Sequence, residues 1–381
     1  MKPLQMVDLK QQYQRIKPKV DAAVSEVLES SLFIGGPKVH QFSQALAGYL
    51  DVKHVITCAN GTDALQVALM ALDLQPGDEV ITPSFTYIAT NEVVALLKLQ
   101  PVFVDVDPKT FCIDPAKLKK AITPRTKVIV PVHLYGQCAN MEAIMSIAHD
   151  HSVSVIEDAA QAIGADYFFL NGSVKKAGTI GTIGCTSFFP SKNLGCYGDG
   201  GAMFTNDDEL ALKLKMIANH GQQKRYYHEL VGCNSRLDAL QAAILNIKLP
   251  LLDGYINARR KVAKYYDKAF GGNEKIKTPF RAAYCNHVFH QYTLILDNVN
   301  DARKYRDDLV EYLGQHNVPS MIYYPVPAHR QQMFCHFGGD SFQLEKTDWL
   351  TERVVSLPMH TEMDEDQLEF VTQKVLEYIN H

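Results

Sequence analysis

One stretch of the sequence governs how the rest of the chain is interpreted: Thr186-Ser187-Phe188-Phe189-Pro190-Ser191-Lys192-Asn193-Leu194-Gly195-Cys196-Tyr197-Gly198-Asp199-Gly200-Gly201. A lysine stands there between a short run with strand propensity and a cluster of four glycines. Lys192 can be a solvated surface residue. It can also be the amine that forms a Schiff base with an aldehyde cofactor, which requires a fixed and partly desolvated lysine. The stretch alone leaves both interpretations open, so residues elsewhere in the chain must decide between them.

Length and composition narrow the class of protein. The chain has 381 residues, of which 46% are apolar and 21% charged, and its formal net charge is −4. This length suits one large and one small globular domain, and the lack of a long basic run argues against nucleic-acid binding. The eight cysteines show neither C-x-x-C pairs nor metal-ligand spacing, which predicts reduced, buried thiols and no metal site. Without an apolar signal core or a run of ~20 apolar residues, we expect a soluble cytoplasmic protein.

Apolar spacing predicts strands that alternate with helices through the first two thirds of the chain. Strands are predicted at residues 54–58, 79–82, 102–106, 128–132, 153–157, 183–189 and 201–205. Helices are predicted at residues 11–28, 38–50, 64–72, 88–98, 115–121, 141–149, 208–220 and 235–251. Such alternation is typical of an α/β fold with a parallel sheet and crossovers on both of its faces.

The pattern changes after about residue 250. A long polar helix is predicted at 255–270, followed by strands at 288–296 and 320–324 and helices at 302–316 and 364–379. This α+β pattern predicts a large domain of residues 1–250 and a smaller C-terminal domain of residues 251–381. Residues 1–35 are expected to pack on the small domain.

An acid follows a predicted strand upstream of the lysine. Asp158, in Glu157-Asp158-Ala159-Ala160-Gln161, lies at the carboxyl end of that strand, where open α/β sheets bind their ligands. Taken alone, an acid in this position is more often a helix cap or a surface loop acid. The functional alternative is a carboxylate that keeps a pyridinium nitrogen protonated, which is what makes pyridoxal phosphate an electron sink.

Three further sites fit the same cofactor. Asn60-Gly61-Thr62-Asp63 begins a predicted helix, whose free N–H groups and dipole favour a phosphate, although an ordinary helix cap has the same pattern. Ser187 adds a hydroxyl five residues before Lys192 that can hold the same phosphate. Tyr87 can stack on a flat ring or fill the core.

These residues occur in the order of a fold-type I pyridoxal phosphate enzyme, and the chain resembles the DegT-type, or StrS-type, sugar aminotransferases. The resemblance spans most of the first 250 residues and is carried by Asn60-Gly61-Thr62-Asp63-Ala64-Leu65, Pro83-Ser84-Phe85-Thr86-Tyr87, Glu157-Asp158-Ala159-Ala160-Gln161, Ser187-Phe188-Phe189-Pro190-Ser191-Lys192 and Asn234-Ser235-Arg236-Leu237-Asp238. It implies an α/β large domain with a mostly parallel central sheet flanked by helices, and a smaller α+β C-terminal domain.

The resemblance also implies a role for each cofactor-binding residue. Lys192 is expected to be the catalytic residue and to form the Schiff base with pyridoxal 5'-phosphate. Asp158 is expected to pair with the pyridine nitrogen, Gln161 to contact the ring hydroxyl and Tyr87 to stack on the ring. A pKa of Lys192 lowered by the nearby cofactor would suit a lysine that shuttles protons.

The same resemblance implies contacts to the cofactor phosphate and to a second subunit. Thr62, Asp63 and Ser187 are expected to bind the cofactor phosphate. In the family, Asn234 reaches the phosphate of the neighbouring subunit's cofactor, which implies a homodimer with shared active sites. Arg236, in the same motif, is a candidate for contacting substrate across that interface.

The implied reaction moves an amino group from L-glutamate to a nucleotide-linked keto-sugar, with Lys192 as proton carrier. The wider sequence resembles enzymes that aminate carbon 3 of UDP-2-acetamido-2-deoxy-3-oxo-glucuronate or of dTDP-3-oxo-6-deoxyhexoses, in making amino sugars for surface polysaccharide such as O-antigen. Amination of a 4-oxo sugar is the alternative. One branch of the family has histidine in place of the lysine and removes a hydroxyl, so Lys192 disfavours a sugar dehydratase.

Substrate contacts are harder to assign. Phe33, Lys224, Arg225, Tyr323 and His329 are candidates for nucleotide and sugar contacts, and each is equally compatible with a structural role. Several relatives have His-Tyr-Pro where this chain has Tyr323-Tyr324-Pro325, which weakens the case for an acidic sugar.

The sequence leaves two other functions open. A regulatory or sensor protein would bind the cofactor or a sugar nucleotide without turnover. A pyridoxal phosphate enzyme of another kind, such as a lyase, would act on amino acids alone. The intact set of Lys192, Asp158 and Gln161 argues against the first of these.

Overall fold

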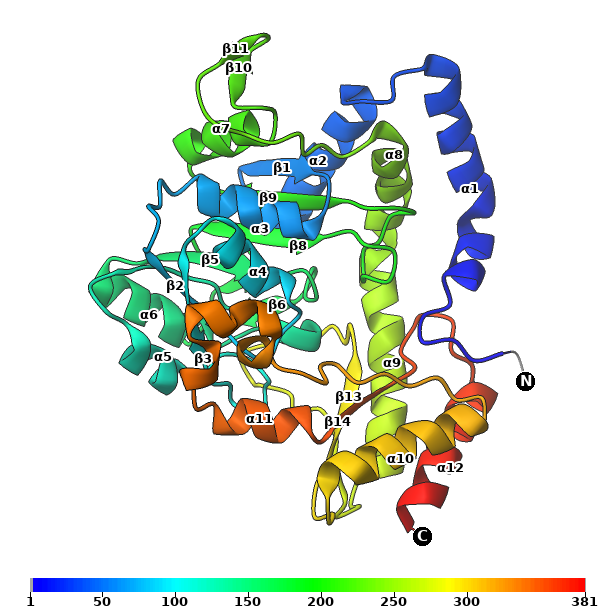
Figure 1. The fold of residues 1–381 in the computed structure, drawn as a ribbon. Coiled ribbons are helices and arrows are strands. Elements are labelled where there is room, and N and C mark those ends of the chain that lie inside the picture. The colour runs from blue at the N-terminus through cyan, green and yellow to red at the C-terminus, as the bar shows by residue number, and fades with distance from the viewer. Residues whose placement is uncertain (1–2, 381) are drawn as a thin grey trace.

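The computed structural model describes residues 3–380, and a seven-stranded sheet forms its centre (Figure 1). Its strands lie in the order β1-β9-β8-β5-β4-β2-β3. They are β1 (His54–Cys58), β2 (Glu79–Pro83), β3 (Gln100–Val104), β4 (Thr126–Ile129), β5 (Ser154–Asp158), β8 (Ile183–Ser187) and β9 (Gly201–Thr205). β9 runs antiparallel to both of its neighbours, β1 and β8, and the other six strands all run in one direction. The predicted mostly parallel sheet is confirmed.

Helices cover both faces of this sheet (Figure 1). They are α2 (Gly36–Leu50), α3 (Gly61–Met70), α4 (Ala89–Leu96), α5 (Pro115–Ala121), α6 (Met141–His151), α7 (Asp208–Ile217) and α8 (Ala239–Lys248). The first helix, α1 (Leu9–Ser30), packs on α8 instead. Successive strand residues point to opposite faces, so Ile81 joins a core with α2, α5, α6 and α8, while Val80 joins one with α3, α4 and α7. Burial on both faces explains the nearly continuous apolar strands.

A second, antiparallel sheet lies in the C-terminal part of the chain. It contains β12 (Ile276–Lys277), β13 (Tyr292–Leu296) and β14 (Val354–Leu357). The accompanying helices are α9 (Leu252–Phe270), α10 (Ala302–Gln315), α11 (Glu345–Thr351) and α12 (Glu365–Asn380). Two short hairpins, β6 (Asp166–Phe168) with β7 (Val174–Lys176) and β10 (Gln222–Lys224) with β11 (Tyr227–His228), complete the described strands.

The long helix α9 belongs to both halves of the chain. Leu252 and Ile256 pack in the core of the central sheet, whereas Val262 and Tyr266 pack in the core of the antiparallel sheet. The division after residue 250 therefore stays a prediction, because a continuous helix crosses from one core to the other just beyond it. Figure 1 shows α9 running from below α8, past β13 and β14, toward α12.

The N-terminal segment divides its contacts. Leu4 packs in the core of the antiparallel sheet. In contrast, Ile16 and Val20 of α1 pack against Ile244 of α8, so most of the helix lies along the central-sheet part of the chain (Figure 1).

One predicted strand is wrong. Residues 320–324 form only a single bridge, between Met321 and Ser356 of β14, and then leave the sheet edge. The prediction failed because two tyrosines of this apolar run, Tyr323 and Tyr324, line a cavity instead of pairing with a neighbouring strand.

Most of the cysteines are buried thiols. Six of the eight cysteines are buried, Cys233 is half-buried and Cys335 is exposed, and all eight are free. No helix within residues 3–380 combines the length and apolar character that a bilayer span requires.

The core of the central sheet is tightly constrained around α2. Phe42 is fully buried and meets Phe188 edge to face, with ring centroids 5.3 Å apart. We predict that Phe42→Ala lowers the free energy of unfolding by about 3–5 kcal/mol, because it removes a buried ring and leaves a cavity. Phe168→Ala, the same change at a side chain that is 41% exposed, should cost less than about 1 kcal/mol. Urea denaturation measures both, and equal losses would contradict this packing.

Candidate active site

The carboxyl ends of the parallel strands open into a cavity of about 500 Å³. Asp158 ends β5 and Ser187 ends β8, and both line the cavity. Tyr87 follows β2 and Gly61 follows β1 along the same edge. Because ligands bind where parallel strands end, this cavity is the candidate active site.

The cavity brings together many of the residues predicted for the site. Its lining includes Thr62, Tyr87, Asp158, Gln161, Ser187, Lys192 and Tyr323. Of the residues described, it does not include Asp63, Asn234, Arg236, Phe33, Lys224, Arg225 or His329.

Asp158 is held by partners from several elements. Thr90 Oγ1 on α4 donates to Oδ2 at 2.8 Å, and the Ala160 N–H donates to Oδ1 at 3.1 Å. The backbone is fixed as well, since Asp158 donates its N–H to Pro131 and accepts from His133 N–H. Sequence reasoning missed Thr90, because nothing in its local sequence relates it to an acid 68 residues later.

The neighbouring Glu157 points away from the cavity into a buried network. His133 Nε2 donates to its Oε2 at 2.8 Å, and the tautomer follows from the Ala139 N–H, which donates to His133 Nδ1 at 3.0 Å. The N–H groups of Gly178, Ile180 and Gly181 also donate to this carboxylate. Burial alone would raise the pKa of Glu157, but these donors outweigh it and the pKa lies below its usual value. The network fixes the strand end that presents Asp158.

Lys192 is half-buried at the start of the glycine-rich loop. Its N–H donates to the Phe189 carbonyl at 2.8 Å, and the buried Lys248 donates to the Gly195 carbonyl three residues later. Burial lowers the pKa of the Lys192 amine to about 8, although the Asp158 carboxylate opposes this shift. Desolvation by the protein alone is therefore enough to lower the pKa, and no cofactor is needed for it. At pH 7 roughly a tenth of the amine is neutral.

A phosphate cradle lies where α3 approaches β8. Asn60 caps the helix by accepting from the Asp63 N–H at 2.8 Å, and Gly61 and Thr62 begin its first turn. A Cβ on Gly61 would lie 2.6 Å from Ser187 Cβ, so only glycine lets the helix start approach that serine. The arrangement suits a phosphate, because it combines a helix N-terminus with a hydroxyl.

Asp63 has a different environment from Thr62, which lines the cavity. Its Oδ2 accepts a hydrogen bond from Ser235 Oγ at 2.6 Å, and the same hydroxyl accepts from the Ala59 N–H at 3.0 Å. The carboxylate is thereby engaged with the 234–238 segment. A direct phosphate contact from Asp63 stays a prediction.

The far wall of the cavity comes from later parts of the chain. Gln161 Oε1 accepts from the Tyr135 N–H at 2.8 Å, and its Nε2 donates to Tyr324 OH at 3.1 Å. His290 and Gln291 line the same wall. Sequence reasoning noted Tyr324 only as part of a departure from relatives and missed both His290 and Gln291, which precede β13 in a stretch predicted simply as a strand.

The remaining predicted contacts lie outside the cavity. Asn234 and Arg236 are exposed, and Phe33, which is 42% exposed, accepts at its carbonyl from the Ala239 N–H at 2.8 Å. Lys224 and Arg225 are on the β10–β11 hairpin that projects at the top of Figure 1. Lys224 Nζ lies 4.8 Å from the centre of the Tyr227 ring, and the guanidinium carbon of Arg225 lies 5.0 Å from the centre of the Tyr226 ring.

His329 is fully buried between two parts of the chain. Its Nδ1 lies 2.7 Å from Ser84 Oγ, and that oxygen also accepts from the His329 N–H at 3.0 Å. These contacts give His329 a structural function beside the cavity wall, and its predicted contact with substrate stays a prediction.

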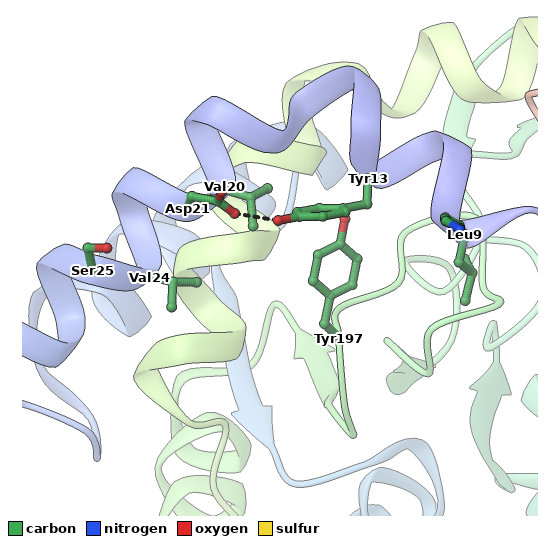
Figure 2. Close-up of a pocket in the computed structure, with 8 residues that line it drawn as sticks. Leu9, Tyr13, Val20, Asp21, Val24, Ser25 and Tyr197 are labelled. Carbon is green, nitrogen blue, oxygen red and sulfur yellow. Dashed lines mark hydrogen bonds between the residues drawn. The ribbon is translucent and has the colours of Figure 1, made fainter.

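A second depression, of about 720 Å³, lies between α1 and the glycine-rich loop (Figure 2). Tyr13 OH donates to Asp21 Oδ1 at 2.5 Å, and the Tyr13 ring meets Tyr197 edge to face at 5.9 Å. Tyr197 follows Lys192 by five residues, so this groove adjoins the loop from outside the cavity. None of the residues predicted for the site lines it.

Comparisons with known proteins agree with this geometry. Residues 14–376 match the DegT/DnrJ/EryC1/StrS aminotransferase family. The chain is 47% identical over 368 residues to UDP-2-acetamido-2-deoxy-3-oxo-D-glucuronate aminotransferase of Pseudomonas aeruginosa, covering 97% of this chain and 98% of that protein. It is 46% identical over 380 residues to a pleiotropic regulatory protein of Geobacillus stearothermophilus, covering 99% of this chain and 98% of that protein. The solved structure of NtdA from Bacillus subtilis with bound cofactor PMP superposes with a TM-score of 0.87 at 32% identity. The match covers 96% of this chain and 82% of that chain.

The cradle makes a specific prediction for Gly61→Ala. The added Cβ forces α3 and Ser187 apart, so the affinity of the cofactor-free protein for pyridoxal phosphate should fall by about tenfold or more. Gly48→Ala, on α2 with nothing within 4 Å of the added Cβ, should leave that affinity unchanged. Fluorescence titration with the cofactor measures both. Equal affinities of the two variants would contradict the cradle.

A pH dependence follows from the buried amine. Because the folded pKa of Lys192 lies near 8 and the ordinary value is 10.5, its amine should lose its proton at lower pH than exposed lysines do. In cofactor-free protein, competitive acetylation at Lys192 should therefore rise with a midpoint near pH 8, read by peptide mass spectrometry. The exposed Lys175 serves as the control lysine. A common midpoint for both lysines would show that the site does not lower the pKa.

Proposed function

The chain belongs to the DegT/DnrJ/EryC1/StrS aminotransferase family, and we propose that it moves the amino group of L-glutamate onto carbon 3 of a nucleotide-linked keto-sugar. The observation that carries the proposal is the single cavity that holds the Lys192 amine, the Asp158 carboxylate and the cradle at Gly61 and Ser187. An aminotransferase needs all three, because it must bind a phosphate-bearing cofactor, hold the ring nitrogen protonated and move protons.

Pyridoxal phosphate is the cofactor of this family, and the residues around the cavity fit it. When bound, it supplies an electron sink that stabilises negative charge at the substrate carbon. Asp158, fixed by Thr90 and Ala160, places a negative charge where the ring nitrogen would lie. Tyr87 would cover the ring and Gln161 would face its hydroxyl. Thr62, Asp63 and Ser187 would hold the phosphate.

Lys192 performs the proton transfers in both halves of the reaction. Its Nζ has a lowered pKa of about 8, so it can take up and release a proton near neutral pH. In the first half Nζ removes the proton from Cα of L-glutamate, which leaves as 2-oxoglutarate. In the second half Nζ delivers a proton to carbon 3 of the sugar, which leaves as the amino sugar. Partial burial keeps bulk water from competing for these protons.

Carbon 3 is proposed for the sugar because of the relative from Pseudomonas aeruginosa, which is named for a UDP-linked 3-oxo sugar. A dTDP-linked 3-oxo sugar is the other member of the class, and a 4-oxo sugar the alternative. Tyr323, which lines the cavity, is neutral and suits a sugar without a carboxylate at that position. The product would be an amino sugar for surface polysaccharide, made in the cytoplasm.

We further propose that the active form is a homodimer with shared sites. Asn234 and Arg236 are exposed in the single chain and adjoin the cradle through Ser235, which contacts Asp63. Exposed polar groups so close to a phosphate cradle are available to a second subunit. The exposed Phe33 and the β10–β11 hairpin with Lys224 and Arg225 are further candidates for such contacts.

A regulatory function is the second candidate, because one relative of 46% identity is named a pleiotropic regulatory protein. Amino transfer to a sugar separates the two. The protein is incubated with L-glutamate and a panel of 3-oxo and 4-oxo sugar nucleotides. We expect 2-oxoglutarate and a mass shift of the 3-oxo compound, and binding without either product would favour the regulator.

Lys192→Ala tests the catalytic assignment. We expect loss of the visible absorbance of the bound cofactor and a fall in amino transfer of at least about a thousandfold, because both nucleophile and base are removed. Lys175→Ala, at an exposed lysine, should retain both properties. A Lys192→Ala protein that still transfers nitrogen at the wild-type rate would refute the assignment.

A further inference from the structure

His290 is a buried polar residue of the cavity that the mechanism above does not use. Its side chain lines the cavity wall, and the residue is only 4% exposed. Within residues 3–380, no protein group hydrogen-bonds its buried Nδ1. Because Nδ1 has almost no accessible surface, the ring nitrogen that can meet a ligand in the cavity is the other one, Nε2.

The backbone that carries His290 is fixed from three sides. Arg259 Nη1 on α9 donates to the carbonyls of Phe289 and His290, both at 3.2 Å. A Cβ on Gly136 would lie 2.9 Å from the backbone nitrogen of His290. The turn that also hydrogen-bonds Gln161 therefore packs directly against this segment. Asn193, next to Lys192, donates from Nδ2 to the Val288 carbonyl at 3.1 Å. The imidazole is therefore held in place although its own nitrogen has no partner.

The cavity has few groups that can bind a carboxylate. Of the described residues that line it, none is an arginine, and Lys192 is the one lysine. The proposed donor, however, carries two carboxylates. Its α-carboxylate is bonded to the carbon that Lys192 must reach, so this group has to lie close to Lys192 and to the wall beside it.

His290 has the charge surroundings that suit such an anion. Burial, the charge of Lys192 and the charge of Arg259 all lower the pKa of His290 well below its usual value, so the ring is neutral and keeps one N–H. The same positive charges favour an anion beside that N–H. A sugar, in contrast, carries neutral substituents on the atoms next to its ketone carbon and gains less from this field.

We propose that His290 binds the α-carboxylate of the amino donor by a hydrogen bond from its imidazole, and that Arg259 positions it. This inference rests on the proposed function, since it assigns a residue to the donor of that reaction. It makes His290 a donor-specific residue, which acts in the half of the reaction that consumes L-glutamate.

The test uses the holoenzyme and 2-methyl-L-glutamate, which lacks the proton that Lys192 would remove and so reports binding without turnover. Calorimetry should show that His290→Ala weakens its binding by about 10- to 100-fold, the effect of losing a hydrogen bond to a charged group. His290→Asn, which keeps an N–H donor, should recover part of that loss. The half-saturating concentration of the 3-oxo sugar nucleotide should change by less than about twofold.

Two further variants serve as controls, and the outcomes distinguish a failure of this inference from a failure of the proposed function. His149→Ala removes an exposed histidine of α6 and should leave binding of the analogue unchanged. His290→Phe keeps a ring without nitrogen atoms and carries the test if the alanine variant does not fold. Unchanged binding of the analogue by His290→Ala, or a loss confined to the sugar nucleotide, would overturn the inference while the proposed function stands. A wild-type protein that neither binds the analogue nor forms 2-oxoglutarate would overturn both.

Discussion

The site depends on a lysine amine that is held partly out of water beside a carboxylate. Burial pulls the pKa of Lys192 down to about 8, and Asp158 pulls it up. The balance leaves an amine that can exchange protons near neutral pH, which an exposed lysine cannot do efficiently. Much of the surrounding structure serves to maintain that balance. The Glu157–His133 network fixes the strand end under Asp158, and Lys248 fixes the loop after Lys192.

The cavity also depends on contacts between the two halves of the chain. Gly136 allows the 288–290 segment to pack on the turn that orients Gln161, and Arg259 on the long helix α9 binds the same segment. Residues of the central sheet thus form one wall, and His290, Tyr323 and Tyr324 form the other. A substrate between these walls contacts groups whose positions are set by both cores. This explains how one helix that crosses both cores can influence a site at the edge of the sheet.

Much of the fold could be predicted from the sequence, because strands buried on both faces are short apolar runs of a recognisable length. Residues 54–58 and 201–205 are strands with the predicted bounds. The run at 320–324 failed, since an apolar, aromatic segment that lines a cavity has the same composition as a strand. Lys192, Asp158 and Ser187 could be found because each follows or ends a strand or precedes glycines. Thr90 and His290 could not be found in this way. Thr90 matters because it hydrogen-bonds Asp158, which lies 68 residues later in the sequence. His290 matters because a nitrogen of its ring has no partner in the folded chain, which the sequence does not reveal.

The central claim is that nitrogen passes from glutamate to a sugar through the Lys192 cavity. The most direct measurement uses L-glutamate labelled with ¹⁵N at its amino group, together with a 3-oxo sugar nucleotide, and mass spectrometry of the sugar product. The account predicts that the label appears in the amino sugar with the wild-type protein and not with Lys192→Ala. Recovery of all the label in glutamate, with a sugar nucleotide that is bound but unchanged, would contradict it.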